Sequence, residues 1–123
     1  MAKRKEGDLN KAIIKYVQVH ENKGLAYVIR NNTIKSAILR DNGKTGWIVN
    51  GKKGSPDLVL CVAGRFVGCE SKLRNGVQSP QQKEAQRRIE NAGGLYWIVR
   101  TIDDFITHFQ GMISHGEKTL RQV

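Results

Sequence analysis

Two apolar runs separated by a short break constrain the fold more than any other part of the chain. They lie in the segment 54–76, GSPDLVLCVAGRFVGCESKLRNG. The runs Leu58–Val62 and Phe66–Lys72 are rich in residues that favour strands, and Ala63 and Gly64 follow the first run directly. We expect a β-hairpin in which these two residues form the turn.

The two ends of this hairpin carry charges that the expected register brings together. Counting outward from the turn, Asp57 lies directly opposite Glu70, with Cβ atoms about 4.5–5.5 Å apart. Lys72 projects from the same face because side chains alternate along a strand, whereas Cys69 and Ser71 point to the other face. Three charged groups are therefore expected to converge at one end of the hairpin.

Two opposed carboxylates destabilise a sheet unless a positive charge lies between them. Mg²⁺ takes oxygen ligands of this kind, commonly one or two carboxylates together with water and phosphate oxygens. A cation held by Asp57 and Glu70 would polarise a phosphodiester, and Lys72 would stabilise the charge that develops. Each residue also has an ordinary interpretation, in which Asp57 is a turn residue after Pro56 and Glu70 forms an exposed ion pair with Lys72.

The rest of the chain is predicted to form one mixed α/β unit without repeats. Three segments have helical periodicity: 5–20, 80–92 and 103–112. Three others have the composition of strands: GLAYVIRN, GWIVNG and LYWIVRT. The second helix has Ser79 as N-cap, Pro80 as first residue and Gly93 as C-cap, and either Thr101 or Asp103 caps the third. The segment 31–46 gives no clear signal.

The chain is short and strongly basic. Its 123 residues suffice for one core, so we assign residues 1–113 to a single domain and expect 114–123 to form a flexible basic tail. The net charge of +10 suits a polyanion such as nucleic acid or an anionic membrane, although a merely soluble basic protein has the same balance. No run approaches about 20 apolar residues and no apolar signal core follows the basic start, which predicts a cytoplasmic protein without membrane contact.

The two cysteines have no zinc-site spacing. Cys61 and Cys69 lack paired Cys or His partners, and the expected register places them on opposite faces of the hairpin. We therefore expect reduced, structural thiols.

Two polar residues lie on helix faces that the periodicity turns inward. Glu6 shares a stripe with Leu9 and Ile13, although a glutamate in a first helical turn also complements the helix dipole. Gln82 shares a stripe with Ile89, and an inward glutamine needs partners. A backbone carbonyl, a phosphate oxygen or a metal-bound water would each serve.

Three segments together resemble a known nuclease family. GKKGSPDLVL, GCESKL and GVQSPQQKEAQRRIENAGG are similar to the virus-type replication-repair nuclease domain (VRR-NUC) of the PD-(D/E)xK superfamily, and the resemblance extends from Glu6 to about Phe109. It implies an α/β fold with a restriction-endonuclease-like αβββαβα core, a mixed central sheet flanked by helices. Ser71 departs from the family pattern, where an apolar residue is usual, and so does Ser55, where a small apolar residue is common.

The resemblance also implies an activity and a set of site residues. The catalytic residues would be Glu6, Asp57, Glu70, Lys72 and Gln82. Asp57 and Glu70 would also bind Mg²⁺ or Mn²⁺, with the carbonyl oxygen of Ser71 completing the coordination. Stand-alone members, common in bacteriophages, resemble Holliday-junction resolvases and act as homodimers. We therefore expect a structure-selective endonuclease in DNA repair that cuts branched DNA, in the host cytoplasm if phage-encoded.

Basic and aromatic residues suggest how partners are held. Four basic residues near the predicted site are candidates for phosphate contacts: Lys52, Lys53, Arg74 and Lys83. No base-reading helix is evident, which favours recognition of DNA by shape. Tyr27 and Trp47 are candidates for a dimer face or the core, and Trp97, within LYWIVRT, is a better candidate for the core.

Two other functions are compatible with the sequence. The net charge of +10 also fits a non-catalytic DNA-binding module, which needs no metal. A restriction-type endonuclease of the same fold would instead cut a defined duplex sequence.

Overall fold

The computed structural model describes residues 2–31, 34–39, 41–50 and 54–121 of the chain. Within these ranges the elements follow the order α1 (Ala2–Glu21), β1 (Ala26–Arg30), β2 (Ile34–Leu39), β3 (Thr45–Asn50), β4 (Leu58–Val62), β5 (Arg65–Ser71), α2 (Pro80–Asn91), β6 (Leu95–Val99) and α3 (Ile102–Arg121). Four strands form one sheet, and β2 and β3 form a separate hairpin. The predicted α/β class is confirmed.

The central sheet is mixed, with the strand order β1-β4-β5-β6. β1, β4 and β5 pair antiparallel, and β6 pairs parallel with β5 after the chain crosses over through α2. Ala63 and Gly64 form the turn between β4 and β5 with φ of 50° and 82°, the left-handed conformation that two-residue hairpin turns use. Leu58 lies opposite Cys69, so the predicted hairpin and its register are confirmed.

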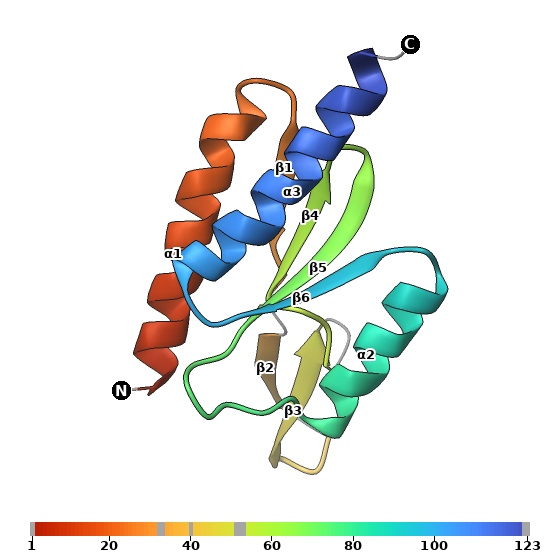
Figure 1. Ribbon diagram of the computed structural model, residues 1–123. Helices are drawn as coiled ribbons and strands as arrows, with labels where there is room; N and C mark the ends of the chain where they lie inside the picture. Colours follow the sequence, from red (N-terminus) through yellow and green to blue (C-terminus); the bar gives the residue numbers. More distant parts are fainter. Residues whose placement is uncertain (1, 32–33, 40, 51–53, 122–123) are drawn as a thin grey trace.

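Helices α1 and α3 lie together on one face of this sheet (Figure 1). The apolar stripes of the two helices meet alternate residues of the strands in one core. Its fully buried members include Ile13, Val17, Leu58, Leu60, Val62, Val67, Val99, Phe105 and Phe109. Burial of each large side chain contributes about 1.5–3 kcal/mol, so this layer holds the strands in place.

Helix α2 covers the opposite face of the sheet only in part. Its start is fixed by a capping box, in which Gln82 N donates to Ser79 Oγ and Ser79 N donates to Gln82 Oε1. Ile89 packs against Gly68 of β5, where an added Cβ would lie 3.2 Å from Ile89 Cδ1. No residue of Pro80–Asn91 is fully buried, and Tyr27, Ile29 and Phe66 stay exposed on the same face of the sheet, so part of this face is open.

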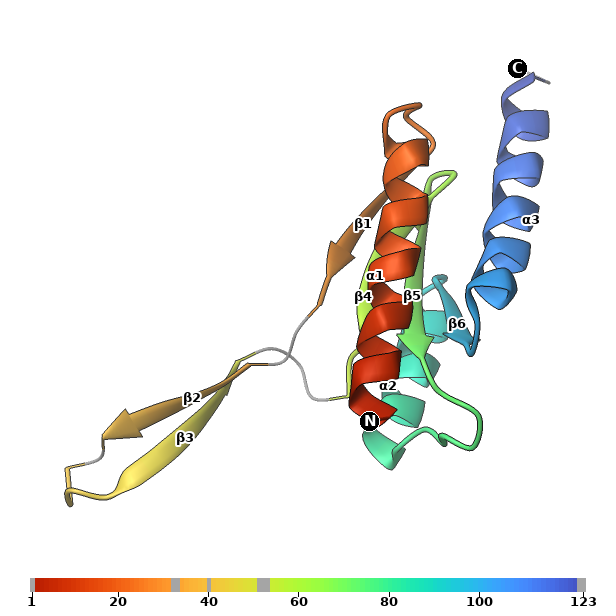
Figure 2. The same ribbon diagram turned by 90° about the vertical axis from the view of Figure 1, so that its left-hand side faces the viewer.

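The β2–β3 hairpin projects away from the central sheet (Figure 2). Its turn contains Gly43 with φ of 79°, and Asn42 Oδ1 accepts a hydrogen bond from Lys44 N at 2.9 Å. The sequence predicted β3 but not β2, because the run IKSAIL lacks the alternation of a half-buried strand. The side chain of Trp47 lies outside the described part of the structure.

Helix boundaries differ from the predicted ones at several ends. α1 begins at Ala2 rather than at residue 5, and Ala92 is the C-cap of α2, with Gly93 following at φ of 95°. Thr101 caps α3, since its Oγ1 accepts a hydrogen bond from Asp104 N at 3.1 Å. Within the described ranges no helix has the length and apolar character that crossing a membrane requires.

α3 also extends well past its predicted end. It continues to Arg121 instead of stopping near residue 112, so residues 114–121 of the expected tail are helical. The apolar stripe that buries Phe105 and Phe109 continues through Ile113, which is also buried. Gly111 does not end the helix, because a single glycine inside a packed helix is tolerated.

Gly68 tests the close packing of α2 on the sheet. A Cβ added there would lie 2.8 Å from Pro56 Cγ, so we expect Gly68→Ala to lower the free energy of unfolding by about 1–3 kcal/mol in chemical denaturation. Gly111→Ala is the control, because its Cβ meets no described atom within 4 Å and should stabilise α3 by about 0.5–1 kcal/mol. Equal stability of Gly68→Ala and wild type would contradict this packing.

Candidate active site

The open end of the β4–β5 hairpin brings two acidic residues together. Leu58 and Cys69 form the last paired position, and Asp57 and Glu70 are the next residues outward. Ser71 N donates to Asp57 Oδ2 at 3.1 Å, which fixes the Asp57 carboxyl against β5. The predicted juxtaposition of the two carboxylates therefore follows from the hairpin register.

The segment that carries Asp57 is anchored on both sides. Asn31 Nδ2 donates to Ser55 Oγ at 2.9 Å and to Pro56 O at 3.0 Å, and Asn31 N donates to Asp57 O at 2.9 Å. Ser55, one of the departures from the family pattern, thus has a partner. Gly54 lets the start of α2 come close to the segment before β4, because an added Cβ at Gly54 would lie 2.5 Å from Gln81 C. Its φ of 81° also favours glycine.

Glu70 is a buried carboxylate with one satisfied oxygen. Its side chain is 1% exposed, and Tyr96 Oη donates to Oε1 at 2.6 Å. Among the described side chains, Oε2 is the buried polar atom that has no hydrogen-bond partner. A buried acceptor without a partner costs about 1–3 kcal/mol, so this oxygen is the strongest sign of a site for an external ligand.

The charges around Glu70 act on its protonation in opposite directions. Burial raises the pKa of Glu70 above its ordinary value, and the hydrogen bond from Tyr96 and the charge of Lys72 oppose this rise. Asp57 and Glu6 add to it, because nearby negative charges disfavour ionisation. All three charged residues predicted to surround Glu70 are thus close enough to influence it.

Lys72 and Glu6 reach this end of the molecule from different elements. Lys72 follows β5 directly, and its N donates to Val99 O at 3.0 Å, which extends the parallel pairing by one residue. Glu6 is half-buried on α1, three residues before the buried Leu9 and seven before the buried Ile13, which agrees with the predicted stripe. Because α1 begins at Ala2, Glu6 lies outside the first turn and the helix dipole does not explain it.

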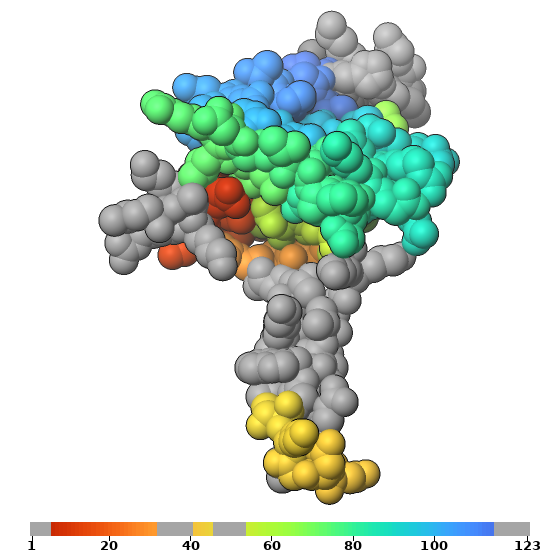
Figure 3. All heavy atoms as spheres, turned by 90° about the horizontal axis from the view of Figure 1, so that it is seen from below, coloured from red at the N-terminus to blue at the C-terminus, as the bar shows by residue number. Residues whose placement is uncertain are grey.

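Figure 3 shows the same arrangement from below. The red part of α1, the green segment after β5 and the teal part of α2 gather at the end of the molecule that faces the viewer. These are the elements that carry Glu6, Lys72 and Gln82.

Ser71 is buried and satisfied by α1. Its side chain is 1% exposed, and its Oγ hydrogen-bonds to Asn10 Oδ1 at 2.6 Å. Asn10 therefore compensates for the polar residue where the family pattern has an apolar one. Cys69, on the same face, is free and buried, and burial followed by the charges of Asp57 and Glu70 raises the pKa of its thiol. Cys61 is also free, as expected, and it is exposed.

Gln82 has a structural partner for half of its amide group. Its Oε1 accepts the capping-box hydrogen bond from Ser79 N at 2.8 Å, so the backbone partner is an N–H group and not the carbonyl that the sequence suggested. The Nε2 group is the half of the side chain that remains for a phosphate or a water. Gln82 is half-buried at the start of α2.

The structure describes two of the four residues that are predicted to bind phosphates. Arg74 and Lys83 are exposed, on the segment after β5 and on α2. The carbonyl of Arg74 accepts a hydrogen bond from Arg100 Nη1 at 3.1 Å, which holds that segment near the end of β6. Lys52 and Lys53 lie outside the described residues, so their contacts stay predictions.

Sequence reasoning missed Tyr96 and Gln78. The sequence places Tyr96 in a buried strand, but its hydroxyl donates a hydrogen bond to Glu70, and the nearby Gln78 side chain acts to lower the pKa of that hydroxyl. Burial and the hydrogen bond to Glu70 raise the pKa of Tyr96, so the hydroxyl keeps its proton and acts as a donor. The sequence signal for this contact is a tyrosine within an otherwise apolar strand, because a buried tyrosine hydroxyl needs a hydrogen-bond partner.

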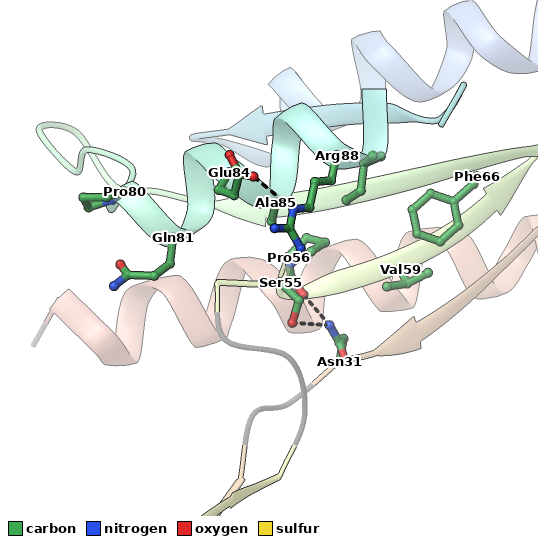
Figure 4. Close-up of a pocket in the computed structure, with 11 residues that line it drawn as sticks. Asn31, Ser55, Pro56, Val59, Phe66, Pro80, Gln81, Glu84, Ala85 and Arg88 are labelled. Atoms are coloured by element: carbon green, nitrogen blue, oxygen red, sulfur yellow. Dashed lines mark hydrogen bonds and ion pairs between the residues drawn. The ribbon is translucent and has the colours of Figure 1, made fainter. Parts of the chain in front are cut away.

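A groove of about 740 Å³ lies beside the acidic pair, between α2 and the open part of the sheet (Figure 4). Its apolar lining includes Val59, Phe66 and Ala85, and Arg88 lies along it next to Glu84. The predicted catalytic residues do not line it. The groove is therefore a separate surface feature from the acidic pair.

The acidic pair fits a hard divalent cation. In the part of the chain that the structure describes, no three His, Cys, Asp or Glu residues gather to form a metal cluster. Mg²⁺ commonly needs only one or two carboxylates besides water and substrate oxygens. Asp57 and Glu70 meet this need, and the unpartnered Oε2 of Glu70 is an oxygen of the right chemistry.

Comparison with known proteins adds no assignment. No protein-family model matches the chain, and no curated protein matches it. The function proposed below therefore rests on the residues and contacts described above.

Replacing Glu70 by glutamine tests the cost of its burial. Glu70→Gln keeps an acceptor for Tyr96 and removes the charge. We therefore expect the free energy of unfolding of this variant, measured without metal at about pH 8, to exceed that of wild type by roughly 1–3 kcal/mol. The pKa of Glu70 is higher in the folded chain than in the unfolded chain. Wild type therefore loses stability as the pH rises from about 4 through the folded pKa. The difference in free energy of unfolding between the variant and wild type should disappear at about pH 4.

Chemical denaturation across this pH range measures the effect. The exposed Glu90 provides the control, since Glu90→Gln should change the free energy of unfolding by less than about 0.5 kcal/mol. A Glu70→Gln variant less stable than wild type at about pH 8 would show that the chain itself compensates the buried charge.

Proposed function

We propose that the chain is a metal-dependent, structure-selective DNA endonuclease of the VRR-NUC type, which hydrolyses phosphodiester bonds. One observation carries the proposal: the Glu70 carboxylate is buried with an unpartnered oxygen, next to a second carboxylate, Asp57. Such an arrangement destabilises a chain by itself, and ionisable groups perturbed in this way are concentrated at functional sites. A divalent cation is the partner whose charge and ligand preference suit it.

Each residue has a separate role in this proposal. Asp57, Glu70 and the Ser71 carbonyl would hold Mg²⁺ or Mn²⁺, which polarises the phosphodiester and lowers the pKa of the attacking water. Lys72 contributes a positive charge that stabilises the extra negative charge developing on the phosphate. Glu6 is a further carboxylate close enough to act on Glu70, and it is available to accept a proton from water.

Gln82 completes the site from α2. With Oε1 held by Ser79 N, its Nε2 group has a fixed direction and can donate to a water or a phosphate oxygen. A capping glutamine thus orients the helix start and donates a hydrogen bond to the substrate.

The order of elements supports the proposal. When the β2–β3 hairpin is set aside, the chain runs α1, β1, β4, β5, α2, β6, α3, which is the αβββαβα order that the resemblance implies. The acidic pair lies at the open end of the second and third strands of that order. We include in the proposal that this core is of the restriction-endonuclease-like type.

Branched DNA is the proposed substrate. The net charge of +10 favours phosphate contacts without sequence preference, and exposed Arg74 and Lys83 lie on the elements that carry the site. A four-way junction has two equivalent strands to cut, and the described part of one chain carries one acidic pair of this kind. A two-fold homodimer is the simplest assembly that cuts both.

The open face of the sheet is the proposed dimer surface. Tyr27, Ile29 and Phe66 expose 63%, 49% and 46% of their surface on the face that α2 leaves uncovered. The groove lined by Val59 and Phe66 continues this face. Of the aromatic candidates, Trp97 is buried and belongs to the core, whereas Tyr27 is available for a partner.

Cleavage of a labelled four-way junction tests the activity. We expect paired nicks with Mg²⁺ or Mn²⁺ and none with chelator, because the carboxylates alone do not activate water. Asp57→Ala and Glu70→Ala should each lower the rate by roughly 1,000-fold or more while junction binding is retained. Glu90→Ala, an exposed carboxylate on α2, should cut like wild type.

Three results would contradict the proposed activity. Retained cleavage by pure Asp57→Ala would remove the acidic pair from the reaction. Tight binding without cleavage in either metal would indicate a non-catalytic binding module. Preference for one linear duplex sequence over the junction would indicate a restriction-type enzyme.

Light scattering tests the dimer. We expect wild type to have twice the mass of one chain and Tyr27→Glu to be monomeric, because a buried unpaired charge disfavours association. Val19→Glu is the matched control, since Val19 is 55% exposed on α1, against the other face of the sheet. A dimeric Tyr27→Glu variant would place the interface elsewhere.

A further inference from the structure

Polar side chains extend from α2 toward the Glu70 carboxyl. Tyr96 Oη donates to Glu70 Oε1 at 2.6 Å, and the Gln78 side chain lies close enough to Tyr96 to act against the rise of its pKa. Gln78 Nε2 in turn donates to Gln86 Oε1 on α2 at 3.0 Å. Glu70 on β5 is thereby tied to β6, and Gln78, which is tied to α2, lies close to Tyr96.

The parallel register of β5 and β6 explains how Tyr96 reaches Glu70. Tyr96 lies opposite Gly68, and Glu70 is the next residue of β5 on the same face. Gly68 leaves room for the ring, because a Cβ there would lie 3.3 Å from Tyr96 Cδ2. The ring therefore lies against Gly68, and its hydroxyl extends to Glu70.

The hydroxyl makes the two oxygens of Glu70 unequal. Oε1 has a short hydrogen bond, and Oε2 has no partner among the described residues. A carboxyl held at one oxygen has fewer orientations to lose when the other oxygen binds a ligand. Hydrogen bonds from surrounding residues orient metal ligands in this way in many proteins.

We infer that Tyr96 is a positioning residue, whose hydroxyl fixes the Glu70 carboxyl so that Oε2 is the oxygen presented to the cation. This inference rests on the proposed function. Gln78 supports Tyr96 from the segment before α2 and is the next residue in the same chain of contacts. Neither residue is assigned a contact with DNA.

Tyr96→Phe tests the role, because it keeps the ring over Gly68 and removes only the donor to Glu70. Calorimetric titration of the whole chain with Mn²⁺ should give an affinity weaker than wild type by about tenfold or more. Junction cleavage should fall at limiting Mn²⁺ and recover as Mn²⁺ is raised, with KM for the junction unchanged. A residue that only stabilises the fold would not produce this metal-dependent rescue.

Two further variants make the test specific. Tyr16→Phe is the matched control, because it removes a hydroxyl that accepts a hydrogen bond from Gln110 between α1 and α3. Its Mn²⁺ affinity should equal that of wild type. Gln78→Leu removes the outer member of the contact chain and should weaken Mn²⁺ binding in the same direction, to a smaller extent. This variant carries the test if Tyr96→Phe does not fold.

The outcomes separate this inference from the proposed function. If wild type, Tyr96→Phe and Gln78→Leu bind Mn²⁺ equally and cut equally at limiting metal, the positioning role is wrong and the nuclease proposal stands. If wild type binds no Mn²⁺ and cuts no DNA, the nuclease proposal fails and the inference fails with it.

Discussion

The burial of the Glu70 carboxylate is the constraint on which the rest of the structure depends. It lies on the third strand of the four-stranded sheet, between β4 and β6, where water does not reach it. A charge in that position needs compensation, and Tyr96 satisfies only one of its two oxygens. The chain thus keeps a polar group where an apolar one would be more stable, which points to a function that requires it.

Several elements act together to maintain this arrangement. The hairpin turn sets Asp57 beside Glu70, and Asn31 anchors the segment before β4 through three hydrogen bonds. The start of α2 is fixed by the Ser79 capping box, and Gln78 links that region to Tyr96. The polar contacts therefore lie on a rigid frame, as the proposed site for a cation and a phosphate requires.

Sequence reasoning succeeded where the determinants are local. A two-residue turn fixes the pairing of both flanking strands, so the opposition of Asp57 and Glu70 followed from counting. The contact of Tyr96 with Glu70 depends on the parallel register of β6, which is set across a whole helix and has no local pattern. β2 was not predicted because its sequence lacks the alternation of apolar and polar residues that marks a half-buried strand. The end of α3 was not predicted because it depends on packing of residues beyond Gly111.

The central claim is that Asp57 and Glu70 bind a divalent cation together. The most direct measurement is the anomalous scattering of Mn²⁺ in crystals of the protein grown or soaked with the metal. The account predicts a peak in contact with an oxygen of Asp57 and with Oε2 of Glu70, while Tyr96 keeps its hydrogen bond to Oε1. A well-ordered Asp57 and Glu70 pair without a peak, at saturating Mn²⁺, would contradict it.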